Sequence, residues 1–128
     1  MATRLNTAPA LAVGETPTAV DVVAAFRDTV VAKLTYFVGK DPQHALDHDW
    51  LLATSLAVRD RVVEHWMDST RRTYREGSKR VYYFSFEFLT GRLLGDALGN
   101  LGLTDIADSA LADLGVDLDR LRKLEPDP

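Results

Sequence analysis

The spacing of apolar residues predicts a chain made mostly of helices. The apolar positions of the first helix recur every three or four residues, and they are Val22, Phe26, Val30, Leu34 and Phe37. Thr18 and Asp21 have the spacing of a capping box just before this stretch, and Gly39 suits the left-handed residue that follows a helix. We therefore predict a first helix that begins near Thr18 and ends before Gly39.

A second and much longer helix is predicted to begin at Asp47 or Asp49 and to end near Glu76. Its apolar stripe consists of Leu52, Leu56, Val63, Trp66, Thr70 and Tyr74, widened by Leu51, Val58, Val62 and Met67. At 1.5 Å per residue this helix is roughly 40 Å long. Such a length, with apolar residues around much of the circumference, indicates a helix that has neighbours on several sides.

The stretch from Val81 to Phe86 predicts a strand. Every residue in it except Ser85 is apolar or aromatic, which is typical of a strand buried on both faces, as in a parallel sheet covered by helices. A single strand of this kind leaves both of its hydrogen-bonding edges without partners. We therefore expect a mostly α fold with a single buried-type strand, and a chain that is part of a larger protein.

Three shorter helices are predicted after this strand. Leu93, Leu94, Ala97, Leu98 and Leu101 form the apolar side of the first, with Thr90 as its cap. Thr104 is expected to cap the second, which ends at Gly115, and Asp117 to begin a short last one.

Composition narrows the function classes. A net charge of −4 gives no general reason to expect a nucleic-acid partner, and no apolar run is long enough to cross a membrane. The absence of cysteine excludes disulfides and thiolate metal sites and fits a cytoplasmic protein. Residues 1–17, interrupted by Pro9 and Gly14, are interpreted as a mobile N-terminal arm rather than a secretory signal.

Two clusters of polar residues invite a functional interpretation. His44 and His48 are four residues apart, but no third ligand is placed beside them, so we assign no metal site. Arg71, Arg72 and Arg75 lie at the end of the long helix. They can form an anion or effector patch, or they can be solvated cations that favour a helix C-terminus; the second interpretation is preferred because a helix C-terminus repels anions.

Glu87 and Arg92 are the candidates for a substrate cleft. Glu87 directly follows the predicted buried strand, and open α/β sheets place their ligand crevice at that end of a strand. A carboxylate there can orient a sugar hydroxyl or a water molecule, or it can form a salt bridge with Arg92. From the residues alone both roles remain open.

The segment KRVYYFSFEFLTGRLLGDALGNLGL resembles the start of the catalytic core of glycogen, starch and maltodextrin phosphorylases. The family pattern falls on Lys79, Arg80, Tyr82, Tyr83, Ser85, Glu87, Phe88, Gly91 and Arg92. Upstream, HDWLLATSLAVRDRVVEHW is similar to the family's long helix, and downstream LGVDLDRLRKLEPDP is similar to the approach to its glycine-rich loop.

The resemblance implies an α/β parent fold of two Rossmann-like domains of GT-B type, in a cytoplasmic homodimer. It implies an enzyme that uses inorganic phosphate to release glucose 1-phosphate from the ends of α-1,4-glucan chains. The family's cofactor is pyridoxal 5'-phosphate, and its attachment lysine lies outside this chain. Animal members stack AMP on an aromatic residue where this chain has Arg75, so the resemblance does not imply AMP control.

The leading interpretation is that residues 18–128 are the N-terminal part of the first phosphorylase domain, ending before the glycine-rich loop. With no catalytic or cofactor-binding residue expected in this part, the chain alone is predicted to be inactive. The alternative keeps the ancestry without the enzyme: an inert fragment that serves at most as a helical binding or dimerisation module.

Overall fold

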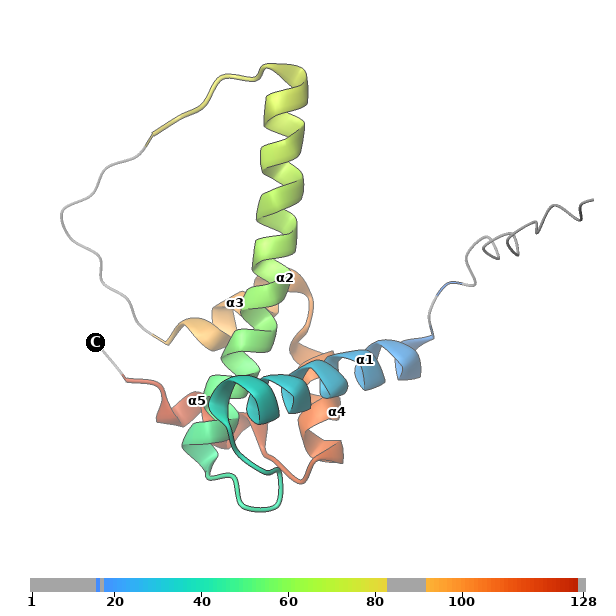
Figure 1. Cartoon of the computed structure of the whole chain (residues 1–128), viewed down its shortest axis with the longest axis vertical. Coiled ribbons are helices and arrows are strands. Elements are labelled where there is room, and N and C mark those ends of the chain that lie inside the picture. The colour runs from blue at the N-terminus through green and yellow to red at the C-terminus, as the bar shows by residue number, and fades with distance from the viewer. Residues whose placement is uncertain (1–15, 17, 83–91, 127–128) are drawn as a thin grey trace, which may run out of the picture.

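The computed structural model describes residues 16, 18–82 and 92–126, and these residues form helices connected by loops. In chain order they are α1 (Ala19–Ala32), the π-helical turn η1 (Lys33–Val38), α2 (Asp47–Glu76), α3 (Leu93–Leu101), α4 (Thr104–Asp113) and α5 (Leu118–Leu124). In Figure 1, α2 stands upright, α1 crosses its lower part, and α3, α4 and α5 gather around the same lower part.

The predicted strand is wrong. Val81 and Tyr82 lie in no regular element and are 94% and 73% exposed, and the described residues contain no strand. The remainder of the predicted strand, residues 83–86, falls outside the described residues. A central strand needs hydrogen-bonding partners on both edges, and the described part of the chain supplies none, so apolar composition alone was not sufficient evidence for a strand.

The first helix begins where its capping residues predict. The Thr18 hydroxyl accepts a hydrogen bond from the Asp21 N–H at 3.2 Å, and the Asp21 carboxylate accepts from the Thr18 N–H at 3.1 Å. Phe26, Val30 and Leu34 are buried, as the periodicity predicts. Phe37, which shares the predicted face, is 67% exposed instead, because the π-helical turn changes the register of the residues that follow it.

Helix α2 begins and ends close to the predicted positions. The N-cap residue is Leu46 rather than Asp47 or Asp49, but Asp49, at the third helical position, supports the start because its carboxylate accepts a hydrogen bond from the Leu46 N–H at 2.9 Å. Gly77 ends the helix with a φ of 61°. The buried positions are Trp50, Leu51, Ala53, Thr54, Ala57 and Val58. All of them lie in the lower part of the helix. Leu51 and Val58 of the predicted stripe are therefore buried, whereas Leu52, Val62, Trp66, Met67 and Tyr74 of that stripe are 40% to 72% exposed.

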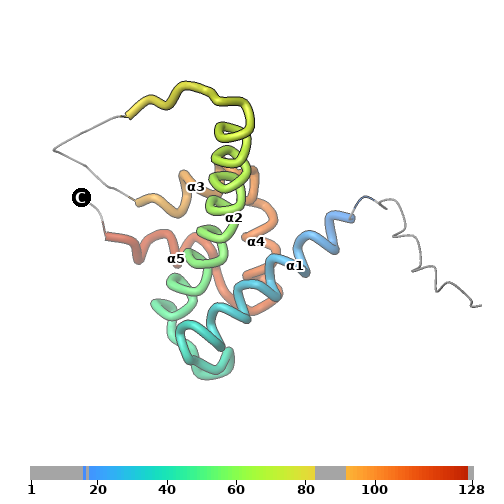
Figure 2. Tube along the Cα trace, turned by 45° about the horizontal axis from the view of Figure 1, so that its top comes forward, coloured from blue at the N-terminus to red at the C-terminus, as the bar shows by residue number. Residues whose placement is uncertain are grey.

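One core joins the helices. It is formed by Phe26, Val30 and Leu34 from α1 and η1, the buried residues of α2, and leucines and alanines of α3, α4 and α5. The tube in Figure 2 shows α1 lying across the lower part of α2, with the three C-terminal helices close by. Burial of these side chains is the main favourable contribution to folding.

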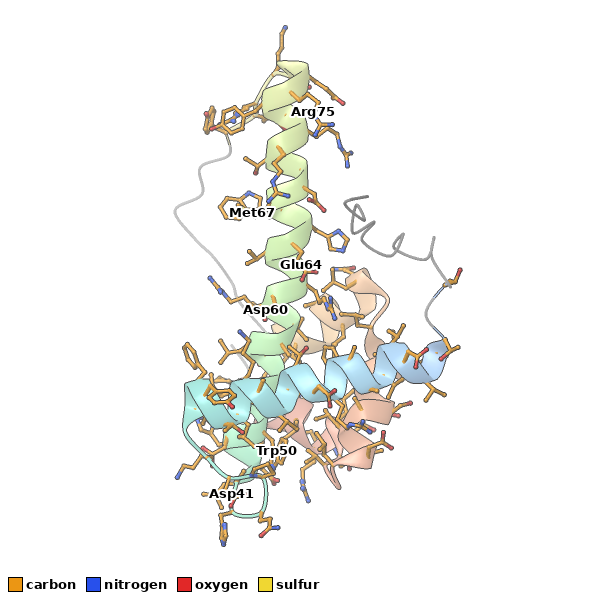
Figure 3. The ribbon with its side chains drawn as sticks, turned by 45° about the vertical axis from the view of Figure 1, so that its right-hand side comes forward. Asp41, Trp50, Asp60, Glu64, Met67 and Arg75 are labelled. Carbon is orange, nitrogen blue, oxygen red and sulfur yellow. The ribbon has the colours of Figure 1, made fainter. Side chains whose placement is uncertain are left out.

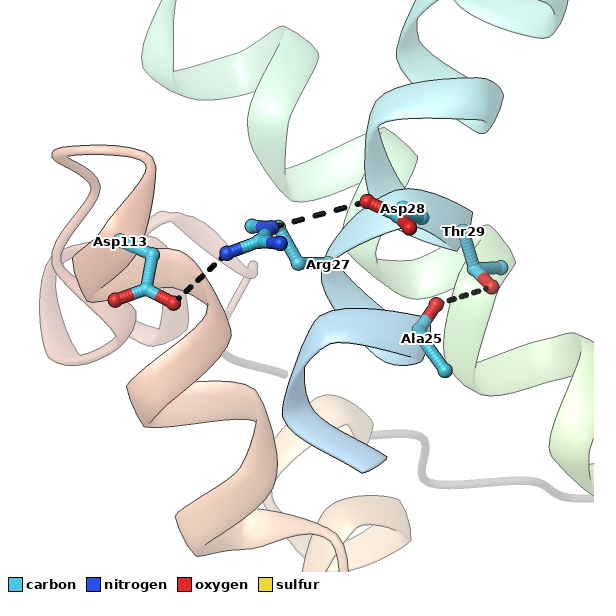
Figure 4. Close-up of polar contacts among 5 residues, drawn as sticks. All are labelled: Ala25, Arg27, Asp28, Thr29 and Asp113. Carbon is cyan, nitrogen blue, oxygen red and sulfur yellow. Dashed lines mark hydrogen bonds and ion pairs between the residues drawn. The ribbon is translucent and has the colours of Figure 1, made fainter. Parts of the chain in front are cut away.

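Ion pairs at the edges of this core connect helices that are distant in sequence. Arg27 of α1 reaches Asp113 of α4 at 3.2 Å and its neighbour Asp28 at 3.8 Å (Figure 4). Lys33 pairs with Asp60 of α2 at 3.0 Å, a half-exposed contact that contributes on the order of 1 kcal/mol or less. These pairs therefore help to orient the helices more than they stabilise them.

Candidate functional site

Arg92 is the part of the predicted cleft pair that the structure describes. It occupies the N-cap position of α3, and its Nε donates a hydrogen bond to the backbone carbonyl of Glu125 at 3.3 Å. Glu87 lies outside the described residues, and so does Thr90, the predicted cap. The pairing of Glu87 with Arg92 therefore stays a prediction.

Glu125 is a residue that the sequence did not single out. It follows α5, yet its carboxylate accepts a hydrogen bond from the Leu94 N–H at the start of α3, at a distance of 2.9 Å. The two residues are separated by 31 positions in the chain, so no local motif could indicate the contact. Arg92 occupies the N-cap position of α3 but makes no side-chain cap hydrogen bond, so the first N–H groups of α3 need an acceptor from elsewhere in the chain.

A polar hollow of about 350 Å³ lies where α5 approaches α3. Its lining residues are Arg92, Gly95, Asp96, Asp119, Arg122, Lys123 and Glu125. Three cationic and three anionic side chains balance one another, so the hollow has no excess of positive charge that would select an anion. A Cβ added at Gly95 would come within 2.8 Å of the Arg122 Nη2, so glycine allows this close approach.

An apolar groove of about 530 Å³ lies beside the hollow, between α2 and α3. Its apolar lining includes Leu52 and Val62 of α2, Leu93 and Ala97 of α3, and Pro126. Leu52, Val62 and Leu93 are 40%, 45% and 57% exposed, so the groove is open to solvent. Glu125 lines both the groove and the polar hollow, and it therefore marks the boundary between them.

The predicted anion patch lies at the far end of α2. Arg71, Arg72 and Arg75 are exposed, and Figure 3 shows Arg75 near the tip of the helix, far from Trp50 at its base. Arg71 pairs with Asp68 at 3.2 Å, and the nearby Arg80 guanidinium stacks over the Tyr74 ring at 4.4 Å from its centroid. The structure does not place this patch beside Arg92, so the two candidate sites are separate.

The two histidines considered as ligands lie at the base of the molecule. The Nδ1 of His44 is 3.5 Å from the Asp41 carboxylate, and both side chains are largely exposed. Within residues 16, 18–82 and 92–126, no group of three or more histidine or acidic side chains is arranged to bind a metal ion. In the same part of the chain, no helix combines the length and the hydropathy that a membrane span requires.

Comparison with known proteins shows which proteins this segment is similar to. No family model matches the chain. Its sequence is 44% identical over 106 residues to the glycogen phosphorylase of Haemophilus influenzae, a match that covers 83% of this chain and 13% of that protein. The glycogen phosphorylase of Pasteurella multocida is 42% identical over 106 residues, with the same coverage. The brain form of glycogen phosphorylase from Bos taurus is 38% identical over 105 residues, or 82% of this chain and 12% of that protein.

These matches and the Lys79–Arg92 motif show that the segment is similar to glycogen phosphorylases over 82–83% of its length. It spans about 13% of the length of the bacterial relatives, which fits the N-terminal portion of such a protein.

Proposed function

We propose that this chain forms the N-terminal portion of an α-glucan phosphorylase. That enzyme transfers a glucosyl unit from the end of an α-1,4-glucan to inorganic phosphate and releases glucose 1-phosphate. The observation that carries the proposal is the 44% identity over 83% of the chain to a glycogen phosphorylase, together with the motif from Lys79 to Arg92. The same resemblance supports a cytoplasmic homodimer as the working form.

Within this proposal, residues 18–128 contribute to the first of two Rossmann-like domains. The capping box at Thr18 and the shared helical core support a structural unit that begins at this residue. The proposed contribution of the chain to the reaction is the positioning of sugar, through Arg92 and Glu87. Arg71, Arg72 and Arg75 are exposed at the tip of α2, which supports their interpretation as solvated cations that favour a helix C-terminus over that of an effector surface.

The cofactor expected for the family is pyridoxal 5'-phosphate, which supplies a phosphate group for proton transfer when it is bound. The lysines of this chain do not fit its attachment. Lys33 is engaged with Asp60 at 3.0 Å, and Lys40, Lys79 and Lys123 are exposed. A lysine that forms a Schiff base is activated by a desolvated pocket or a second cation, so we assign the attachment lysine to another part of the larger protein.

The proposal is tested in two proteins. The chain alone, incubated with glycogen, phosphate and pyridoxal phosphate, should form no glucose 1-phosphate above a blank without protein, because catalysis needs its groups placed together. A hybrid enzyme, in which this chain replaces the matching segment of the Haemophilus influenzae phosphorylase, should be active to within about tenfold of that enzyme.

A matched pair of variants makes the hybrid informative. Glu87→Gln should lower kcat/KM by about ten- to a hundredfold if its charge organises the sugar, while Glu76→Gln, at the exposed end of α2, should have no effect. A hybrid that folds and retains the cofactor but forms no glucose 1-phosphate would contradict the proposed function. Wild-type kinetics for Glu87→Gln would contradict only the role of that residue.

A further inference from the structure

The start of α3 depends on an acceptor from another helix. The first N–H groups of any helix have no partner within it, and Arg92, at the N-cap position, supplies no side-chain acceptor. The Leu94 N–H instead donates to Oε1 of Glu125 at 2.9 Å. Leu94 is 5% exposed, and removal of this carboxylate would take away the acceptor that its N–H has in the folded chain.

Glu125 also contacts the residue before the helix. Its backbone carbonyl accepts the hydrogen bond from Arg92 Nε at 3.3 Å, so one residue contacts both Arg92 and Leu94. The side-chain contact is the stronger of the two, because a carboxylate at a helix N-terminus combines a charge-assisted hydrogen bond with the helix dipole.

Contacts of α5 with its neighbours hold this helix in place, and they therefore fix the position of Glu125, which follows it. Arg120 of α5 pairs with Asp47 at the start of α2 at 2.9 Å. Leu118 and Leu121 are buried in the core, and Gly95 leaves room for the Arg122 guanidinium against α3. The position of Glu125 is therefore determined by packing around α5 and not by α3 alone.

We propose that Glu125 is a positioning residue for the phosphorylase reaction. Its carboxylate fixes the first turn of α3 and thereby orients Arg92, the described member of the substrate-cleft pair. The inference rests on the proposed function, in which Arg92 helps to position the sugar. It differs from a purely structural cap in that loss of the carboxylate changes turnover and not only stability.

The contact is tested first in the 128-residue chain by amide hydrogen exchange. Glu125→Ala should raise the exchange rate of the Leu94 amide by about tenfold, the equivalent of one hydrogen bond. Glu125→Gln keeps an acceptor oxygen and should raise it by only about two- to threefold. Glu76→Ala removes an exposed glutamate at the end of α2 and should leave Leu94 unchanged. An unchanged Leu94 rate in folded Glu125→Ala would overturn the inference.

The consequence for turnover is tested in the hybrid enzyme. Glu125→Ala should lower kcat by about tenfold with KM for glycogen within about twofold, and Glu125→Gln should restore most of the loss. A lower melting temperature with unchanged kcat and KM would show a cap with no role in the reaction, and it would overturn the inference. If the unmutated hybrid itself is inactive, the proposed function fails, and the role of Glu125 in turnover fails with it. The Leu94 exchange rates still show whether Glu125 forms the hydrogen bond with the Leu94 N–H.

Discussion

The two tryptophans of the chain lie on the same helix in opposite surroundings. Trp50, near the start of α2, is 5% exposed, whereas Trp66, farther along it, is 65% exposed. The lower part of α2 contacts α1, η1, α3 and α5, and the upper part rises beyond them (Figures 1 and 3). One continuous helix therefore includes both a core element and a solvent-exposed extension.

The difference comes from what packs against each part. In the lower part, Ala53 and Ala57 are fully buried, and their small side chains let neighbouring helices approach closely. The upper part is also apolar, yet Val62, Trp66, Met67 and Tyr74 remain between 43% and 72% exposed. Apolar composition predicted burial along the whole helix, but burial also requires a surface to pack against.

The upper part must be stabilised by local interactions. Arg61 pairs with Glu64 and Arg71 with Asp68, each three residues apart, and Gly77 caps the end. Pairs of this kind contribute about 0.2–0.5 kcal/mol each. We therefore expect the two parts to respond very differently to mutation.

Replacing each tryptophan by alanine gives the largest expected contrast. Trp50→Ala should lower the free energy of unfolding by about 3–5 kcal/mol, because it leaves a cavity in the core. Trp66→Ala should change it by less than about 0.5 kcal/mol. Urea unfolding followed by circular dichroism measures both, since helix content does not depend on the removed chromophore. Similar losses from both variants would show that the upper part is packed in solution, and sedimentation would then test self-association.

Hydrogen exchange should show the same contrast without mutation. Amides from Ala53 to Val58 should exchange through global unfolding, whereas those from Trp66 to Tyr74 should exchange through local opening. We expect the upper amides to exchange about a hundredfold faster or more, as measured by nuclear magnetic resonance. Equal protection along α2 would mean that the whole helix unfolds as one unit, and it would contradict this division.

A buried hydroxyl offers a smaller effect in the lower part. Thr54 is fully buried, and its Oγ1 has no hydrogen-bond partner among the described residues. Thr54→Val keeps the shape and removes the unsatisfied group, so it should stabilise the chain by about 1 kcal/mol. Thr70→Val, in the upper part, is the matched control and should have an effect within about 0.5 kcal/mol. A destabilised Thr54→Val variant would mean that the hydroxyl is hydrogen-bonded in solution.

Local signals predicted the helices well. The capping residues Thr18 and Asp21, the ends of α2 and the apolar positions Phe26, Val30 and Leu34 all depend on neighbours within one turn. Phe37 was misplaced because a π-helical turn is not visible in apolar spacing. The strand was wrong because its formation depends on partners distant in sequence, which no local pattern can supply.

In the candidate site too, local patterns could not reveal contacts between residues that are distant in sequence. Arg92 was identified through the family motif, and the structure places it at the start of α3. Glu125 was not identified, because it contacts Leu94 across 31 positions and its neighbours suggested only the end of a short helix. The close approach of Arg122 to Gly95 was equally hidden, since it depends on how α5 packs against α3.

The smallest expected effect concerns the start of α1, where stabilisation is local, as in the upper part of α2. The Asp21 carboxylate accepts hydrogen bonds from the Thr18 hydroxyl at 2.7 Å and from the Thr18 N–H at 3.1 Å. These bonds favour the charged carboxylate, the hydroxyl more strongly, and they lower the pKa of Asp21 below its ordinary value.

The sign of the pH dependence follows from that shift. The folded chain binds the Asp21 proton less readily than the unfolded chain, so this stabilisation is complete above the ordinary aspartate pKa of about 3.9 and is lost as the pH falls through the lowered value. Asp21→Asn should therefore be less stable than the native chain at about pH 7, with a smaller difference at about pH 2.5. Asp28→Asn, on the exposed side of α1, controls for the loss of one negative charge. Urea unfolding at both pH values measures the difference, and a gap between native and Asp21→Asn that does not narrow in acid would show that the capping box does not depend on the charge of Asp21.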